Sequence, residues 1–421
     1  MNTIDFEPLI YALLNPYVGS GLAIVIYALA MAGVVIGIVS GYAAIAVYAE
    51  RKLSAVIQCR LGPMEVGPEI EIKIGGRTIL PKGWYGLGTL ISDAVKLLAK
   101  EDIIPRQADQ LLFRLAPYVV FASTMAAFSI IPFGAFLAPS SIDGGILFLL
   151  AASSVGVLGL VMGGYASNNK WSLYGAMRSV AQVVSYEVPM GLALLSVVIT
   201  VGSLDMREIS DAQSGWIWHW HVLKNPFLLI AFVAYYISAL AETNRAPFDI
   251  PEAESELVSG YHTEYSGMRF SMFFLAEYAN MLLVSLVASL FFLGGFNTGF
   301  AFLDRVFILG PVVLISKATV LVLGMVWLRW TLPRYRVDQL MKLCWKGLLP
   351  ITLFAFLGAG VAVFQDSLVY RLFWRVCIVV LIGFFYYHAQ QGLQPMPERS
   401  REGATDRSDG GSVAGARDGA G

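Results

Sequence analysis

Long runs of apolar residues are the feature that most constrains the fold of this chain. A helix needs about 20 apolar residues to cross the hydrocarbon core of a bilayer. Backbone in lipid must satisfy its own hydrogen bonds, as only helices and closed barrels do, and the alternating pattern of a barrel is absent. The chain is 57% hydrophobic and 14% charged, unlike ordinary soluble domains. We predict an all-α, polytopic membrane protein with about nine transmembrane helices, at residues 22–48, 116–138, 146–165, 180–201, 226–242, 270–293, 306–330, 348–365 and 371–388.

The distribution of basic residues predicts the orientation of these helices. If the N-terminus lies outside, one side of the membrane receives 23 of the 29 Lys and Arg residues. The positive-inside rule places that side in the cytoplasm. The C-terminus is then cytoplasmic, and so are the loops at 49–114, 166–179, 244–271 and 329–348.

The membrane domain is expected to comprise residues 1–393. The remainder, 394–421, is rich in Gly, Ser, Arg and Asp and cannot bury apolar surface. We predict that this segment is a disordered cytoplasmic tail.

The loop at 49–114 contains two further elements. Isoleucines alternate with charged residues from Glu69 to Ile74, and Gly75-Gly76 follows, which predicts a short inserted β-hairpin at 69–80. Residues 86–101 place apolar side chains on one helical face and charged ones on the other, which predicts an amphipathic helix on the cytoplasmic membrane surface. A loop helix packed on neighbouring spans would show the same pattern.

An acidic loop at 242–269 is the most unusual polar segment. Carboxylates near a low-dielectric phase are costly unless they are paired, solvated or protonated, and membrane proteins keep them mainly for function. Helix capping or a solvated loop would also account for three of them, Glu252, Glu254 and Glu256. The acids of this loop, set against Arg245, are Glu242, Asp249, Glu252, Glu254, Glu256 and Glu264.

Glu187, Glu277 and Lys317 are charged residues that lie inside predicted spans. Burial makes ionisation of a carboxyl group costly, so that it can exchange protons near neutral pH. Together with the acidic loop, these residues favour a hydrated proton path. A structural Glu–Lys pair is the alternative.

Metal and redox centres are not expected in this chain. Cys59, Cys344 and Cys377 lie far apart without a CxxC pair, and the four histidines form no ligand set. His219 and His221, in WIWHWH, are interpreted as part of an interfacial aromatic belt. A redox role would therefore require electrons from a partner.

Four segments together resemble one family. They are AERKLSAVIQCRLGP (49–63), ASNNKWSLYGAMRSVAQVVSYEVP (166–189), AETNRAPFDIPEAESELVSGYHTEY (241–265) and LRWTLPRYRVDQLMKLCWKGLLP (328–350). The resemblance is to the membrane subunit of respiratory complex I that docks the quinone-reducing arm, called the H subunit in bacteria and NADH dehydrogenase subunit 1 in mitochondria. It extends over about residues 20–365. The inserted hairpin and the Thr89-Leu90 pair depart from the family pattern.

The resemblance implies a site and a set of partners. Family members form most of a tunnel that admits quinone as substrate, while iron–sulfur clusters and flavin belong to hydrophilic partner subunits of the peripheral arm. Antiporter-like and small membrane subunits and the lipid bilayer are further partners; no nucleic acid is expected. The implied proton relay comprises Glu187, Glu242, Glu252, Glu254, Glu256 and Glu277, and the implied quinone-binding residues are Arg51, Lys52, Arg60, Arg245 and Asp249.

We therefore predict a subunit of proton-translocating NADH:quinone oxidoreductase in the bacterial inner membrane, with no covalently bound cofactor. Quinone would enter between the first and sixth spans and the amphipathic helix. Arg51, Lys52 and Arg60 could instead be ordinary positive-inside residues. Two alternative functions are a membrane subunit of a related energy-converting hydrogenase or formate hydrogenlyase, and a stand-alone secondary transporter.

Overall fold

A computed structural model describes residues 20–64, 66–67, 72–74, 77–80, 84–134, 144–250, 258–300 and 309–364. The chain divides into two compact units, Met1–Leu368 and Val369–Gly421, and every described residue belongs to the first. Several predictions fall outside the described residues: the ninth span at 371–388, the domain boundary at 393, the disordered tail at 394–421, and Glu252, Glu254 and Glu256.

The described part of the chain is helical, as predicted. Seven segments are long and apolar enough to cross a membrane, and a shorter apolar helix, α9, brings the described candidates to eight of the nine expected spans. The seventh long segment joins α13, a π-helix η5 and α14 without a break, over Val337–Val363. The principal helices are α2 (Ser20–Ile57), α4 (Gln110–Phe128), α5 (Gly145–Ala166), α6 (Lys170–Val201), α9 (Pro226–Glu242), α11 (Gly267–Phe292), α12 (Leu309–Thr331), α13 (Val337–Lys342), η5 (Leu343–Leu348) and α14 (Leu349–Phe364).

Polar side chains mark where several of these helices begin. Asp109 accepts hydrogen bonds from two backbone N–H groups of α4, Asn169 accepts one at the start of α6, and Asn225 accepts one at the start of α9. These three helices therefore begin at local capping signals, and for α4 and α6 the cap comes before the predicted apolar run. Helix α6, for example, begins at Lys170, although its apolar run was placed at 180–201.

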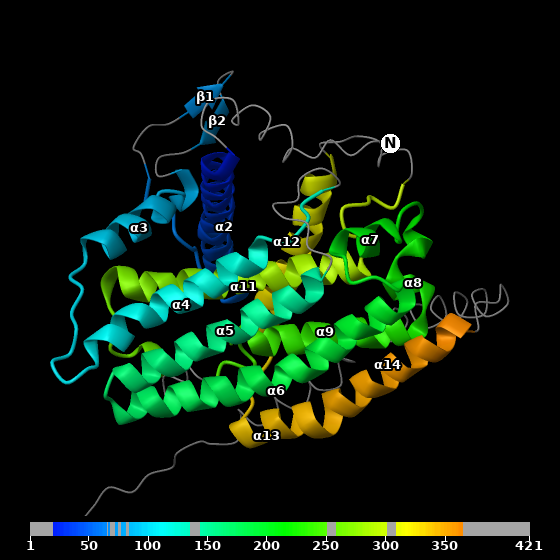
Figure 1. The fold of residues 1–421 in the computed structure, drawn as a ribbon. Coiled ribbons are helices and arrows are strands. Elements are labelled where there is room, and N and C mark those ends of the chain that lie inside the picture. The colour runs from blue at the N-terminus through cyan, green and yellow to red at the C-terminus, as the bar shows by residue number, and fades with distance from the viewer. Residues whose placement is uncertain are drawn as a thin grey trace, which may run out of the picture. The chain divides into compact units, whose positions relative to one another are not determined.

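Helix α11 lies at the centre of the bundle (Figure 1). It packs against α2, α3, α4, α9 and α12. Of its most apolar stretch, 78% is buried inside the protein, against 22% for α2. Most side chains of α11 therefore pack inside the bundle, whereas much of α2 is exposed.

The remaining described elements are short. Strands β1 (Ile72–Ile74) and β2 (Arg77–Leu80) pair antiparallel, with Ile74 opposite Arg77 and a bulge between Ile72 and Lys73. This pairing agrees with the predicted hairpin. The short helices are η1 (Trp84–Gly86), α3 (Thr89–Ala99), α7 (Met206–Asp211), η2 (Ile217–His219), α8 (His221–Lys224) and η3 (Gly260–His262).

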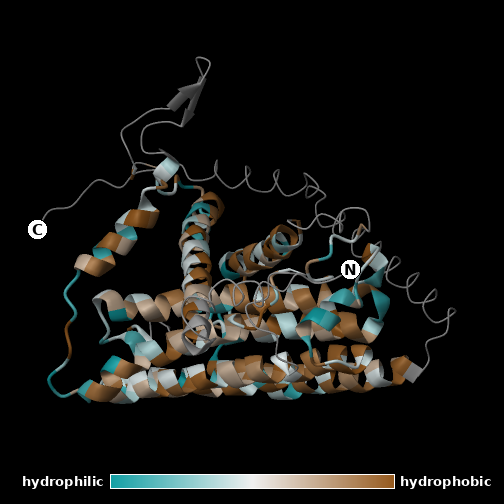
Figure 2. Cartoon of the chain, turned by 45° about the horizontal axis from the view of Figure 1, so that its top comes forward, coloured by the Kyte–Doolittle hydropathy of each residue, from teal (hydrophilic) through white to brown (hydrophobic). Residues whose placement is uncertain are grey.

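Helix α3 is the predicted amphipathic helix, shorter than the expected 86–101. Its apolar side chains Ile91, Val95 and Leu98 are exposed, as a helix lying on a membrane requires. Asp93, expected on the outer polar face, instead turns toward α2. Figure 2 shows that apolar residues dominate the long helices, whereas polar residues gather near helix ends, such as the segment before α4.

Candidate functional site

Two cavities flank helix α11, and consecutive residues of that helix line them. Glu277 lines one cavity and Tyr278 lines the other. Successive helical residues point about 100° apart, since a helix has 3.6 residues per turn. A single helix can therefore connect two chemically different sites.

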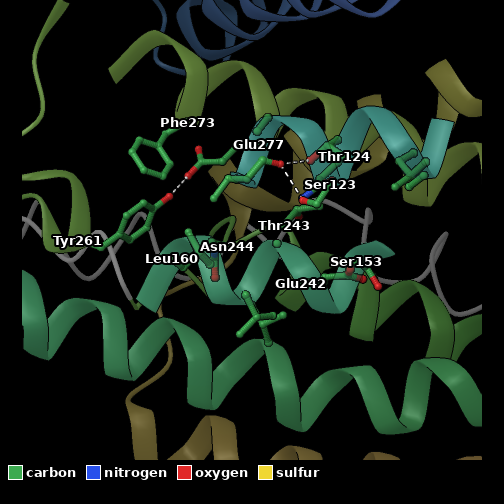
Figure 3. A pocket seen from close by; sticks show the side chains of 18 residues that line it. Ser123, Thr124, Ser153, Leu160, Glu242, Thr243, Asn244, Tyr261, Phe273 and Glu277 are labelled. Atoms are coloured by element: carbon green, nitrogen blue, oxygen red, sulfur yellow. Dashed lines mark hydrogen bonds between the residues drawn. The ribbon is translucent and has the colours of Figure 1, made fainter. Parts of the chain in front are cut away.

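The first cavity, called here the carboxylate cavity, is small and partly polar, with a volume of about 50 Å³. A cavity needs a volume of at least roughly 10–15 Å³ to hold one water molecule, so this cavity has room for more than one. Figure 3 shows it between side chains from α4, α5, α6, η3 and α11 and from the end of α9. The lining residues are Val120, Ser123, Thr124, Ala127, Ser153, Gly156, Val157, Leu160, Val183, Glu242, Thr243, Asn244, Tyr261, Phe273, Ala276, Glu277, Asn280 and Leu283.

Two predicted relay residues, Glu242 and Glu277, share this cavity. The Tyr261 hydroxyl donates a hydrogen bond of 2.9 Å to Oε1 of Glu277 (Figure 3). Oε2 of Glu242 is buried and has no hydrogen-bond partner among the described residues. Such an atom is costly to bury without a partner, so water in the cavity or a proton on the carboxyl group would stabilise it.

Glu187, another residue of the predicted relay, lies on α6. It does not line this cavity. It accepts a hydrogen bond from the Ser154 hydroxyl of α5. Ser154 directly follows Ser153, which lines the cavity. The structure thus groups Glu187, Glu242 and Glu277, which are separated along the sequence.

The acidic loop is held against α6 at both of its described ends. Before the gap in the described residues, Gln182 Nε2 donates to the carbonyl oxygens of Ala241 and Phe248, at 2.7 and 2.8 Å. Beyond the gap, the backbone of Gly260 packs against Gly175 of α6. A Cβ on Gly175 would lie 2.7 Å from Gly260 Cα. Glycine is therefore required at 175 for the close approach that positions η3.

The second cavity, called here the apolar cavity, has a volume of about 440 Å³ and lies between α2, α3 and α11. Arg51 and Asp93 line it and form an ion pair of 2.6 Å that joins α2 to α3. The lining residues are Ser40, Ala43, Ala44, Val47, Tyr48, Arg51, Thr89, Leu90, Asp93, Ala94, Lys96, Leu97, Met268, Phe270, Ser271, Phe274, Leu275 and Tyr278.

A buried charged cluster connects the two cavities. Glu50 accepts a hydrogen bond of 2.6 Å from the Tyr278 hydroxyl and forms ion pairs with Arg329 and Arg245, the latter at 3.5 Å. The Arg245 guanidinium also stacks on the Tyr278 ring, 4.2 Å from its centroid. Because Arg245 follows Asn244 of the carboxylate cavity directly, only a few contacts separate the two cavities.

Glu50 and Arg329 were not among the residues expected at the site. Glu50 immediately precedes Arg51, so its position in the ERK segment was the available signal. The sequence did not show that this carboxylate is turned inward, with only 6% of its surface exposed.

The other predicted quinone-binding residues have different surroundings. Lys52 Nζ donates to the Pro63 carbonyl, and the exposed Arg60 contacts Gln58 at 2.7 Å; neither lines the apolar cavity. Asp249 forms a 2.9 Å ion pair with Arg334. Of the five, only Arg51 lines the apolar cavity, and Arg245 reaches it through Tyr278.

Lys317 of α12 lies beside the C-terminal end of α11. Its Nζ donates hydrogen bonds of 2.6–3.0 Å to the backbone carbonyls of Leu293, Gly295 and Asn297, and stacks over Trp220. These carbonyls stabilise the ammonium group and are themselves satisfied by it. Lys317 therefore contributes to the end of the helix that carries Glu277.

Comparison with known proteins places the chain in a family. A family model described as NADH dehydrogenase matches residues 29–360. The NADH-quinone oxidoreductase H subunit of Chlorobaculum parvum is 46% identical over 320 residues, covering 74% of this chain and 85% of that protein. The H subunit of Cytophaga hutchinsonii that carries the number 2 is 43% identical over 361 residues, covering 76% and 94%. The chain belongs to the family of NADH-quinone oxidoreductase H subunits.

Membership in the H subunit family confirms the resemblance carried by the four motifs. The chain is thus a subunit of an oxidoreductase complex, and its apolar helices make it a multi-pass membrane protein. The hydrogenase and transporter alternatives are set aside. No cluster of three or more His, Cys, Asp or Glu residues that could hold a metal ion occurs in the part of the chain that the structure describes.

Proposed function

We propose that the apolar cavity admits quinone from the membrane and that the carboxylate cavity relays the protons whose movement is coupled to quinone reduction. The observation that carries this proposal is the placement of Tyr278 and Glu277 in the two cavities on the same helix. The entrance lies between α2, α11 and α3, which are the first and sixth predicted spans and the amphipathic helix.

The size and lining of the apolar cavity support a quinone. Its volume of about 440 Å³ lies within the range of ligand sites, roughly 300–1,000 Å³. Most of its surface is apolar, which suits a quinone ring and prenyl tail, and the Arg51–Asp93 pair provides polar contacts at one side.

Reduction of a quinone to a quinol consumes two electrons and two protons. The electrons would come from iron–sulfur clusters of hydrophilic partner subunits, on the cytoplasmic side. The negative charge formed during reduction would act on the Glu50–Arg245–Arg329 cluster, because electrostatic interactions are strong where water is excluded. Movement of Arg245 would then change the surroundings of Glu242 and favour a proton transfer.

Glu242, Glu277 and Glu187 would carry the proton onward. The hydroxyls of Ser123, Thr124, Ser153 and Tyr261 and the amide of Asn280 provide hydrogen-bonding groups between them. Glu252, Glu254 and Glu256 of the acidic loop are proposed as further members of this relay, on the basis of the family motif.

Replacement of Glu277 by Gln tests the relay. Gln keeps the size and hydrogen bonding of the side chain but cannot release a proton. In the whole complex, reconstituted in vesicles, we expect proton pumping to fall at least about tenfold while the amount of assembled complex is retained. Glu101→Gln, an exposed carboxylate outside both cavities, is the matched control. The same replacement can be made at Glu187 and Glu242. Normal turnover and pumping in all three Glu→Gln variants would contradict the relay.

Replacement of Ala44 by Phe tests the quinone cavity. Ala44 lines the cavity, whereas its neighbour Ile45 is exposed on the outside of α2. We expect Ala44→Phe to raise the KM for a short-chain quinone by about tenfold, because the phenyl ring would occupy space that the quinone needs. Ile45→Phe should leave the KM unchanged. Equal kinetics of the two variants would remove this cavity from the quinone path.

A further inference from the structure

The hydrogen bond between Tyr261 and Glu277 ties the carboxylate cavity to a short helix outside the candidate spans. Tyr261 belongs to η3, and only 1% of its surface is exposed. Its hydroxyl donates to Oε1 of Glu277 at 2.9 Å, at the wall of the cavity (Figure 3). The orientation of the Glu277 carboxyl group therefore depends on how firmly Tyr261 is itself held.

The backbone of Tyr261 is held on α6. Ser172 Oγ of α6 donates to the Tyr261 carbonyl at 2.9 Å. A Cβ on Gly175 would lie 3.0 Å from the Tyr261 nitrogen, so η3 packs closely on the backbone of α6. It is therefore α6, and not the helix that carries Glu277, that sets where the Tyr261 side chain begins.

The ring of Tyr261 is held as well. It meets the Phe273 ring edge-on, with centroids 5.5 Å apart and an interplanar angle of 70°. Phe273 and Glu277 are one turn apart on α11 and lie on the same face of it. A glutamate side chain has more rotatable bonds than a tyrosine, and it loses more rotamer freedom when it is fixed. Tyr261 therefore positions the Glu277 carboxyl group, rather than the reverse.

The position of this carboxyl group decides whether it can exchange a proton. The two groups in a proton transfer must lie within hydrogen-bond reach, directly or through one water molecule, and the carboxylate cavity has room for water. Without the bond from Tyr261, Glu277 would sample other rotamers. The fraction of molecules in which Glu277 reaches the cavity would then fall.

We propose that Tyr261 is a positioning residue of the proton relay. Its hydroxyl holds the carboxyl group of Glu277 in the orientation that exchanges a proton with the carboxylate cavity. The proton moves through Glu277, while the Tyr261 hydroxyl keeps its own hydrogen. This role rests on the proposed function of the carboxylate cavity, and it adds to the relay a residue that is not an acid.

Replacement of Tyr261 by Phe tests this role, because it removes the hydroxyl and keeps the buried ring. In the whole complex, reconstituted in vesicles, we expect proton pumping per assembled complex to fall about tenfold. A hydrogen bond to a charged group favours the bonded orientation by about that factor.

Tyr265→Phe is the matched control. Tyr265 is also buried and also meets Phe273 edge-on, but its hydroxyl donates to the Phe113 carbonyl at 3.2 Å, and it does not line the carboxylate cavity. Loss of this hydroxyl should leave pumping per assembled complex at the wild-type rate.

A double-mutant cycle with Glu277→Gln separates positioning from an independent effect. Such a cycle isolates the coupling of one pair from the other contacts of either side chain. If Tyr261 acts through Glu277, the double variant should pump at the rate of Glu277→Gln alone. Independent effects would instead multiply to a loss of about a hundredfold, and that result would overturn the positioning role.

Infrared difference spectra of the reduced and oxidised complex provide a readout that does not depend on pumping. The carboxyl band of Glu277 is identified by its absence from Glu277→Gln. It should shift in Tyr261→Phe, because loss of a hydrogen bond changes the stretching frequency of the carboxyl group, and it should not shift in Tyr265→Phe. An unshifted band in Tyr261→Phe would overturn the positioning role.

The pumping measurements distinguish failure of this role from failure of the relay. Normal pumping by Tyr261→Phe beside impaired pumping by Glu277→Gln would overturn the positioning role and leave the relay intact. Normal pumping by Glu277→Gln would remove Glu277 from the relay, and the positioning role with it. Loss of assembled complex in Tyr261→Phe, at unchanged pumping per complex, would make the hydroxyl a structural contact only.

Discussion

At the residue scale, Glu50 shows how one buried carboxylate can hold several elements together. Its two oxygens contact side chains from α11, α12 and the segment after α9. An unpaired charge in such a place is costly, whereas a charge with several partners is tolerated. Glu50 therefore stabilises the bundle and also takes part in the proposed coupling between the cavities.

Replacing Glu50 by Gln should destabilise the complex. The side chains of Arg245 and Arg329, 8% and 28% exposed, would lose their common counter-charge. Breaking a buried ion pair from one side costs about 3–5 kcal/mol, and the exposure of Arg329 favours the lower value. The amount and Tm of assembled complex should both fall. Tyr278→Phe, which removes only one hydrogen bond, should cost about 1 kcal/mol. Wild-type stability of Glu50→Gln would show that this cluster is not structural.

His221 is a second residue whose surroundings were misjudged from the sequence. The sequence predicts that His221 belongs to an aromatic belt, but its side chain is buried, and its Nδ1 lies 2.7 Å from the Phe291 carbonyl. Burial lowers the pKa of His221 from 6.5 to about 4. The neighbouring Trp216 and Trp218 are exposed, as a belt requires.

The lowered pKa of His221 predicts a pH-dependent stability. Above pH 6.5 the imidazole is neutral in the folded and unfolded states; as the pH falls toward 4, only the unfolded state takes up the proton. About 3 kcal/mol of stability should be lost over this window. His221→Gln should reduce the pH dependence of Tm, and His219→Gln, at an exposed position, should not. Parallel pH profiles for the wild type and His221→Gln would contradict this prediction.

At the scale of elements, α11 and the acidic loop form one unit with α6. Tyr261 links η3 to Glu277 of α11, and Ser172 of α6 donates to the Tyr261 carbonyl at 2.9 Å. Helix α11 therefore supplies residues to both cavities while its position is set by its neighbours. Helix α3, by contrast, presents an exposed apolar face and contacts the bundle through α2 and α11.

The β1–β2 hairpin is predicted to contact a hydrophilic partner subunit, because a two-stranded hairpin alone is marginally stable in water. Replacing residues 69–80 with a Gly-Ser linker of equal length should weaken docking of the peripheral arm more than membrane insertion of this chain. Native gels and the membrane-bound amount of the chain would measure these two effects. Unchanged assembly and turnover would make the hairpin an exposed decoration.

At the scale of the whole molecule, the unit needs partners to cover its surface. Only 22% of the apolar stretch of α2 is buried, and α2 packs on few neighbours (Figure 1). Arg-rich segments and the hairpin lie on the predicted cytoplasmic side, where the described residues form no soluble domain. Lipid can cover the apolar surface, but not the polar one.

We therefore expect this chain to migrate on a native gel in a large assembly after gentle solubilisation. When it is expressed without the other subunits, its half-life should shorten and quinone reductase activity should be absent. A pulse-chase experiment with and without the partner subunits measures the first effect. Full stability and activity of the isolated chain would contradict this prediction and the proposed division of labour between subunits.

The sequence alone determined the helical membrane fold and the family. Apolar runs and capping residues act over a few turns, so their effect can be read locally, and the same holds for the alternation that predicts β1 and β2. The motifs also identified Glu187, Glu242 and Glu277 as a set. Their order along the chain did not show that Glu242 and Glu277 share one cavity, or that Glu187 is bound by Ser154 next to it.

Tertiary structure alone decided which charges meet. Arg329 lies 279 positions from Glu50 and Tyr278 lies 228 positions from it, so no local pattern pairs them. Lys317, expected as a possible partner of an intramembrane glutamate, binds backbone carbonyls at the end of α11. The physical reason is that burial and pairing depend on how helices pack against each other, whereas helix formation depends mainly on neighbouring residues.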